Sequence, residues 1–134
     1  MLPKSVLYTL KAMSVLGELD KGEYMGAKAL GEKLDLPVNY LGKTMQMLAK
    51  KGYLYSRKGL GGGFALVKDA GAINILEVVE SLGEGKFFTD CFWGSPECSE
   101  DSPCPMHSKW KGLSEQFRDV LNTTTIEHLM QEEK

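Results

Sequence analysis

Apolar residues in the first half of the chain recur every three or four positions, the period of an α-helix with one buried face. Three stretches show this period, at residues 4–19, 26–35 and 38–51. Pro37 stands between the second and the third, where it ends one helix and suits the first turn of the next. Gly52 follows the third stretch at a position typical of a helix C-cap. Three short helices with tight connections predict a helix-turn-helix.

The pattern changes to that of β-strands after the third predicted helix. Residues 53–55 (Tyr-Leu-Tyr) and 64–67 are rich in the aromatic and aliphatic residues that favour strands. The Gly-Leu-Gly-Gly-Gly stretch at 59–63 between them is typical of a hairpin turn. We therefore expect a mainly α fold with one small antiparallel β-hairpin, which is the layout of a winged helix-turn-helix.

The second half of the chain begins with a clear helix start. Asn74 and Glu77 form a capping-box pattern, with Asn in place of the usual Ser or Thr, and the short helix that follows reaches about Leu82. Residues 83–104 then show no period. A loop of that length inside a compact domain is usually functional or disordered.

A long helix is predicted from Pro105 to about Asn122, and Thr124 with Glu127 is predicted to cap a last short helix. Apolar residues three and four apart give the long helix a heptad-like seam. The seam consists of Trp110, Leu113, Phe117 and Leu121. Because such a seam is too apolar to leave in water, we expect a dimerisation helix, with packing inside the monomer as the alternative.

Composition and charge narrow the class of protein. At 134 residues, 43% of them apolar, the chain fits one globular domain. It has no apolar run near the roughly 18 residues of a membrane span and no signal-peptide pattern, so we expect a cytoplasmic protein.

Charge is distributed unevenly along the chain. Residues 1–68 carry 11 Lys and Arg against 5 Asp and Glu, whereas residues 69–134 carry 5 Lys and Arg against 13 Asp and Glu. A basic first half favours an anionic partner, nucleic acid first, although chance also produces unequal halves.

The outward face of the third predicted helix suits DNA. Asn39, Lys43, Gln46 and Lys50 form one polar stripe, and Tyr40 lies at its N-terminal end. Asn and Gln pair with adenine, and Lys reaches guanine or phosphate. We expect Asn39, Tyr40 and Lys43 to reach bases, because they lie at the start of the helix, and Gln46 and Lys50 to touch the backbone. An ordinary solvated helix face would show the same stripe.

The predicted hairpin favours the DNA interpretation. Arg57 and Lys58 immediately precede the glycine-rich tip, and a basic hairpin tip can enter the minor groove beside a recognition helix. The glycines allow the backbone to approach phosphate closely. A nucleotide-phosphate loop is the weaker alternative, because the stretch lacks the Gly-Lys-Ser/Thr ending and joins two strands.

All three cysteines, Cys91, Cys98 and Cys104, lie in the aperiodic loop, and His107 follows them. An odd number in a cytoplasmic chain disfavours a disulfide framework. Structural zinc sites bring their ligands in tight pairs, and none is present here. Wide spacings with thiolates and one imidazole are closer to an iron–sulfur cluster, while bare thiols without metal remain an alternative. With Cys104 as N-cap and Pro105 at the first helical position, His107 is expected to point back toward Cys104.

Residues 37–82, PVNYLGKTMQMLAKKGYLYSRKGLGGGFALVKDAGAINILEVVESL, resemble the core of the Rrf2 family of bacterial winged-helix regulators. The resemblance extends to CPMHSKW and DVLNTTTIEHL further along the chain. It implies a homodimeric transcription regulator that binds a palindromic operator in double-stranded DNA. Lys58 takes the place of the basic wing residue that such proteins put into the minor groove. Gly42 replaces a side chain that discriminates among target sites in IscR-like members, which leaves the operator class open.

The same resemblance implies an iron–sulfur cluster held by Cys91, Cys98, Cys104 and His107, with [2Fe–2S] favoured over [4Fe–4S]. IscR-like members place three cysteines and a following histidine in this region. The first spacing is one residue longer here than in those members, and other members hold [4Fe–4S] with variable first spacings. Some of those use an N-terminal carboxylate of the partner subunit, but residues 4–11 contain none, so His107 is the better fourth ligand.

The sequence thus predicts a homodimeric DNA-binding transcription regulator whose operator binding is controlled by a cluster that senses iron, redox state or nitric oxide. We expect a winged helix-turn-helix domain at 1–82, a sensor loop at 83–104 and a dimerisation segment at 105–134. The alternatives are a cluster-free thiol regulator and a protein-interaction module that does not bind DNA. We expect no enzyme and no small-molecule substrate, because the chain shows neither a paired acid and base nor a nucleophile motif.

Overall fold

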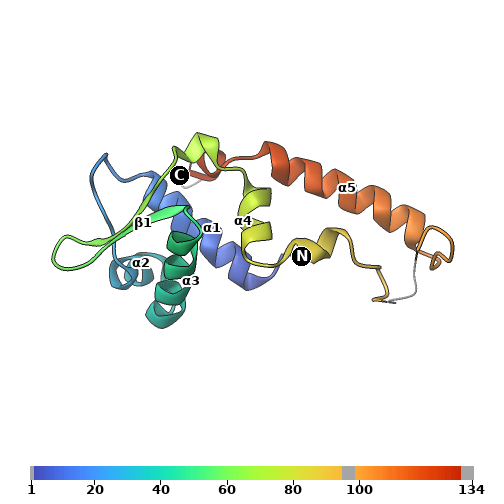
Figure 1. The fold of residues 1–134 in the computed structure, drawn as a ribbon, viewed down its shortest axis with the longest axis horizontal. Helices are drawn as coiled ribbons and strands as arrows, with labels where there is room; N and C mark the ends of the chain where they lie inside the picture. Colours follow the sequence, from blue (N-terminus) through green and yellow to red (C-terminus); the bar gives the residue numbers. More distant parts are fainter. Residues whose placement is uncertain (1, 95–98, 131–134) are drawn as a thin grey trace.

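The structure is a computed structural model, and it describes residues 2–94 and 99–130. It is mainly helical with one antiparallel hairpin, as the sequence predicts (Figure 1). The helices are α1 (Lys4–Gly17), α2 (Ala27–Leu34), α3 (Val38–Lys50), α4 (Ile75–Ser81), α5 (His107–Thr123) and α6 (Ile126–Met130). The strands are β1 (Leu54–Arg57) and β2 (Gly63–Leu66), and two short 3-10 helices are η1 (Ala70–Ala72) and η2 (Gly85–Phe88).

The first three helices form the predicted helix-turn-helix around a shared core. Met13 of α1, Leu30 of α2 and Leu41 of α3 are all fully buried in that core. Asp35 ends α2 in the left-handed conformation, with φ of 56°, and Pro37 is the N-cap of α3. The tight turn between them therefore depends on Asp35, whose left-handed conformation ends α2, and on Pro37, which cannot continue it.

The hairpin is joined to the helix-turn-helix by main-chain hydrogen bonds. Strand β1 pairs antiparallel with β2, and Arg57 opposite Gly63 is the last pair before the tip. Met25, just before α2, donates to and accepts from Phe64 at 3.0 and 2.9 Å. A Cβ atom on Gly63 would lie 2.4 Å from the backbone at Met25, so only glycine permits this approach. The hairpin, which forms the wing, is thus fixed to the helix-turn-helix at its base.

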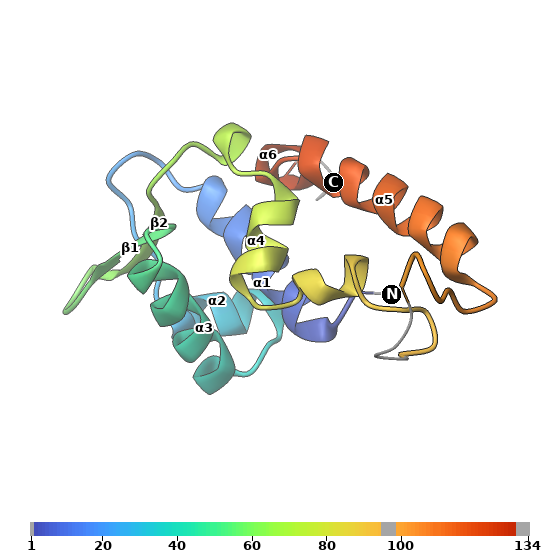
Figure 2. The ribbon, with the colours of Figure 1, turned by 45° about the vertical axis from the view of Figure 1, so that its right-hand side comes forward.

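Helix α4 lies between the helix-turn-helix and the long helix α5 (Figure 2). The predicted capping box at its start is confirmed: Asn74 Oδ1 accepts from Glu77 N at 2.9 Å, and Asn74 N donates to Glu77 Oε2 at 3.2 Å. In its described residues, 83–94 and 99–104, the predicted loop contains one regular element, η2, which the lack of period did not indicate. A single short 3-10 turn is too brief to produce a detectable period.

Two predicted helix starts are wrong. Helix α5 begins at His107 with Met106 as its N-cap, not at Pro105, because residues 105–106 form a turn in which His107 N donates to Cys104 O at 3.0 Å. At α6, the cap is formed by Thr125 and His128 rather than by Thr124 and Glu127. Thr125 Oγ1 accepts from His128 N at 3.4 Å, and Thr125 N donates to His128 Nδ1 at 3.0 Å.

The C-terminal part of the chain shares the core of the N-terminal part. Leu121 of α5 and Ile126 of α6 are buried in it, and α6 packs against α1. The wing and the His107 end of α5 lie at opposite ends of the molecule (Figure 1). Among the described residues, no helix combines the length and apolar character needed to cross a bilayer.

Candidate DNA-reading face and cysteine site

The polar stripe predicted on α3 is exposed. Asn39, Lys43, Gln46 and Lys50 all lie at the surface. They border a shallow groove of about 670 Å³, whose wall also includes Ala27, Val38, Gly42 and Met47. At Gly42 a Cβ atom would only reach ordinary contact distance from Ala27, at 3.8 Å. The glycine therefore widens the groove between α2 and α3 without being required by the backbone.

Tyr40 differs from the rest of the predicted stripe. Its hydroxyl donates to Ser5 O at 3.0 Å, and its ring meets Tyr8 edge-on with 5.9 Å between centroids. These contacts join the start of α3 to α1. Direct contact between Tyr40 and DNA remains a prediction, while its role in positioning α3 follows from the structure.

The two basic residues of the wing are exposed. The guanidinium carbon of Arg57 lies 5.7 Å from the ring centroid of Tyr24, within the range of a cation–π contact. Tyr24 therefore orients Arg57 beside the helix-turn-helix. Lys58 follows at the beginning of the tip, so both predicted wing cations are available to an anionic partner.

The cysteine site lies at the other end of the molecule, between η2 and the start of α5. The sulfur atoms of Cys91 and Cys104 are 3.5 Å apart, although 13 residues separate them in sequence. Cys91 Sγ also accepts from Trp93 N at 3.4 Å. The third predicted ligand, Cys98, lies outside the described residues. The loop thus brings two of the predicted ligands together.

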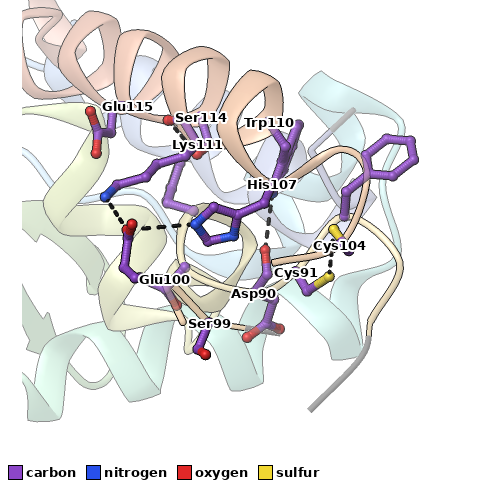
Figure 3. Close-up of a pocket in the computed structure, with 13 residues that line it drawn as sticks. Asp90, Cys91, Ser99, Glu100, Cys104, His107, Trp110, Lys111, Ser114 and Glu115 are labelled. Atoms are coloured by element: carbon purple, nitrogen blue, oxygen red, sulfur yellow. Dashed lines mark hydrogen bonds and ion pairs between the residues drawn. The ribbon is translucent and has the colours of Figure 1, made fainter. Parts of the chain in front are cut away.

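His107 borders the same pocket but points toward Glu100, while the two sulfur atoms face each other (Figure 3). His107 Nε2 lies 3.5 Å from Glu100 Oε1, and Lys111 Nζ donates to the same oxygen at 2.5 Å. The bond from Lys111, with a smaller contribution from His107, lowers the pKa of Glu100 below its usual value. The same bond raises the pKa of Lys111.

The donor set fits a thiolate-bound metal centre in part. Two thiolates on one tetrahedral metal, at about 2.3 Å each, stand roughly 3.7 Å apart, close to the 3.5 Å observed between Cys91 and Cys104. Within residues 2–94 and 99–130, no three His, Cys, Asp or Glu side chains are grouped closely enough to hold a metal ion. The pocket beside the thiols measures about 350 Å³. A cluster at this site would need Cys98 and a rotated His107 to complete it.

Several residues of this site were not predicted from the sequence. Glu100 gave no signal, because only the path of the loop brings it to His107 and Lys111. The spacing of four between His107 and Lys111 does place both on one face of a helix, and could have indicated the pair. Trp93 gave no signal either, since its contact to Cys91 is made by its backbone.

The predicted seam of α5 is divided between two environments. Leu121 is buried, Phe117 packs on Phe88 with 5.7 Å between ring centroids, and Trp110 Nε1 donates to Asp90 O at 3.0 Å. Leu113, in contrast, is 60% exposed. Three of the four seam residues are therefore used within the chain, and the dimer interface remains a prediction.

The three helices, the wing and the exposed basic face define a winged-helix protein of the DNA-binding regulator class. Comparison with known proteins agrees. A family described as "Iron-dependent Transcriptional regulator", Rrf2, matches residues 2–132. The chain belongs to the Rrf2 family, and it is a DNA-binding transcription regulator rather than an enzyme.

The chain is 34% identical over 128 residues to a "Putative HTH-type transcriptional regulator" of Aquifex aeolicus, covering 94% of this chain and 88% of that protein. It is 34% identical over 101 residues to the regulator IscR of Klebsiella pneumoniae, covering 75% of this chain and 61% of IscR. The fold matches CymR, the global cysteine regulator of B. subtilis, with a TM-score of 0.82 at 22% identity over 100% of this chain and 98% of CymR. It also matches T. potens IscR, with a TM-score of 0.78 at 19% identity over 100% of this chain and 88% of that chain.

Proposed function

We propose that this chain acts as a homodimer on a palindromic operator, and that an iron–sulfur cluster at the cysteine site controls its affinity for DNA. The observation that carries the cluster is the 3.5 Å separation of the Cys91 and Cys104 thiols beside the start of α5. The resemblance to IscR supports the cluster, and [2Fe–2S] remains favoured over [4Fe–4S]. Cys98 and His107 would complete the ligand set.

On DNA, α3 would lie in the major groove and the wing in the adjacent minor groove. Asn39 and Lys43 would reach base edges, and Gln46 and Lys50 would touch the backbone. Arg57 and Lys58 would supply the wing cations. The exposure of these side chains supports their assignment to DNA contacts. Such a regulator would act in the bacterial cytoplasm, because its operator lies there.

A chain of contacts connects the cysteine site to helix α3 of the helix-turn-helix. Lys51, at the end of α3, donates through Nζ to Ser81 O at the end of α4, and η2 then leads to Cys91. When bound, the cluster would supply iron that responds to oxidants and nitric oxide. Ordering of Cys91 and Cys104 around it would shift the equilibrium between two settings of α4, and Lys51 would pass that shift to α3.

The test is anaerobic purification, with a visible spectrum, iron and sulfide analysis, and DNA retardation before and after removal of the chromophore. We expect Cys91→Ser and Cys104→Ser to lose the chromophore and the difference in DNA retardation. Ser99→Ala, in the same loop, should keep both. A colourless or zinc-containing wild-type protein would contradict the cluster.

The same sulfur pair favours a second candidate, a thiol switch without metal. Oxidation by a peroxide would form one S–S bond between Cys91 and Cys104. The two thiols would give two electrons and two protons, which reduce hydrogen peroxide to two waters or an alkyl hydroperoxide to one alcohol and one water. We would then expect a metal-free wild-type protein that loses two hydrogens on peroxide treatment and changes its DNA affinity. Reversal by dithiothreitol would support this candidate over the cluster.

The residues proposed to contact DNA are tested at Lys43 and Lys58. Lys43→Ala should weaken binding because it removes a base contact. Lys58→Ala should weaken binding and also lower the salt dependence, because a cation that contacts phosphate contributes to counterion release. Lys109→Ala, on exposed α5, is the matched control. Normal DNA binding by the double variant Lys43→Ala, Lys58→Ala would contradict the site assignment.

A further inference from the structure

The tip of the wing carries one side chain among four glycines. In Gly-Leu-Gly-Gly-Gly, residues 59–63, only Leu60 extends beyond the backbone. It is fully exposed and is the most exposed of the large apolar residues that the structure describes. Its aliphatic surface is therefore available for a partner.

The turn explains the glycines but not the leucine. Gly62 N donates to Gly59 O at 3.0 Å, and Gly61, at the third position of this turn, has φ of +74°. This is the pattern of a type II turn, in which the second position, held here by Leu60, forms an outer corner. A Cβ atom on Gly62 would lie 2.2 Å from Arg57 O, so glycine is required there. Many residues fit the second position, and nothing in the turn selects a large apolar one.

The position of the tip indicates what Leu60 meets. The wing extends away from the helical body beside α2 (Figure 1), and its base is fixed by the pairing of Met25 with Phe64. Arg57 and Lys58, both exposed, directly precede the tip. A partner that is anionic at its edge and apolar further in would satisfy both the cations and Leu60. The minor groove of DNA has this arrangement: it is about 6 Å wide, phosphates line both of its rims, and the apolar faces of the bases become accessible where a base step opens.

We propose that Leu60 is an apolar wedge that enters the minor groove of bound duplex DNA and partly unstacks one base step at the flank of each half-site. The proposal rests on the proposed function, because it requires the wing to lie in the minor groove. Wedges of this kind kink the duplex toward the major groove. Pyrimidine–purine steps unstack most easily, so Leu60 would select such a step without any hydrogen bond to a base.

The experiment starts with duplexes selected from a random library by the wild-type protein. Leu60→Ser and the conservative Leu60→Met are then compared on the selected duplex, together with Lys58→Ala. The measurements are affinity at several salt concentrations, bending by circular permutation, and the fluorescence of 2-aminopurine at the flanking step. Because the Leu60 side chain is fully exposed, the melting temperature of Leu60→Ser should match that of the wild type.

We expect Leu60→Ser to bind about tenfold more weakly, with a smaller bend and no rise in 2-aminopurine fluorescence, but with an unchanged salt dependence. Leu60→Met should restore the bend, and Lys58→Ala should lower the salt dependence while keeping the step preference. Equal affinity and bending of Leu60→Ser and wild type would overturn the wedge alone. Failure of the wild type to enrich any duplex would overturn the proposed function and the wedge together.

Discussion

Position 63 requires glycine because the backbone of a neighbouring segment leaves no room for a Cβ atom, and not only because of its backbone conformation. Its φ of +133° is unusual for other residues, and a Cβ atom would lie 2.4 Å from the backbone of Met25 and Gly26. The pairing that fixes the wing depends on this close approach. The sequence indicated a glycine-rich turn here, but not that the last glycine contacts a segment almost forty residues earlier.

We predict that Gly63→Ala lowers the free energy of unfolding by about 1–3 kcal/mol, because the main chain at Met25 must move away. The matched control is Gly112→Ala, inside α5, where a Cβ atom meets nothing within 4 Å. That change should raise stability by up to about 1 kcal/mol, since Ala favours a helix. Urea unfolding of both variants gives the comparison, and equal stability of the two would contradict the packing described for the wing.

A helix cap could be predicted from the sequence where only one pair of residues was able to form it. Asn74 and Glu77 had no competitor and formed the expected capping box. The cap of α6 was predicted wrongly because three consecutive threonines precede the helix, and the imidazole of His128 selects Thr125. Glu100 could not be predicted at all, because its contacts depend on how a loop without regular structure folds back.

At the scale of elements, helix α5 has two faces with different roles. Phe117 and Leu121 pack within the chain, whereas Leu113 and Val120, seven residues apart, lie 60% and 57% exposed. The sequence predicted one apolar seam because a spacing of three and four cannot show which neighbour covers each residue. The structure assigns part of that seam to the chain's own core.

Phe117→Ala is predicted to destabilise the chain by about 2 kcal/mol or more, because it removes a ring packed against Phe88. Leu113→Ala, on the exposed face, should change the stability of the monomer by less than about 0.5 kcal/mol. Thermal unfolding at protein concentrations low enough to favour the monomer measures both. A larger loss for Leu113→Ala under these conditions would show that the exposed face is packed within the chain.

At the scale of the whole molecule, the exposed face of α5 leads to a prediction about assembly. Light scattering after gel filtration should give about twice the chain mass of 14.8 kDa at micromolar concentration. Leu113→Lys should shift the protein toward the monomer, because it places a charge in the predicted interface. Asn122→Lys, at an exposed polar position on the opposite side of the same helix, should stay dimeric. A monomeric wild type would exclude the homodimer.

The connection between the two ends of the molecule is also testable. Lys51→Met keeps the aliphatic part of the side chain but removes the bond to Ser81 O. We predict that the ratio of DNA affinities with and without the chromophore falls about fivefold, because α3 is no longer coupled to α4. Lys11→Met, on the exposed surface of α1, should leave the ratio unchanged. An unchanged ratio in Lys51→Met would exclude this connection.

The fold as a whole was predictable because its helical periods and its glycine-rich hairpin are local signals. The arrangement of the cysteine site was not, since it depends on the path of residues 83–104. The sequence supplied its candidate ligands, and the structure places Cys91 beside Cys104 while turning His107 toward Glu100.

The pairing of Met25 with Phe64 has a consequence for how binding sites diverge between related regulators. Because two main-chain bonds hold the wing to the segment just before α2, the interval along the duplex between the grooves that we propose for α3 and for the wing would be set by the backbone. Under this proposal, substitutions on α3 or at the tip would change which bases are preferred. Such substitutions would leave that interval the same. Operators of related regulators should therefore differ in base sequence far more readily than in the spacing between the segments that α3 and the wing contact.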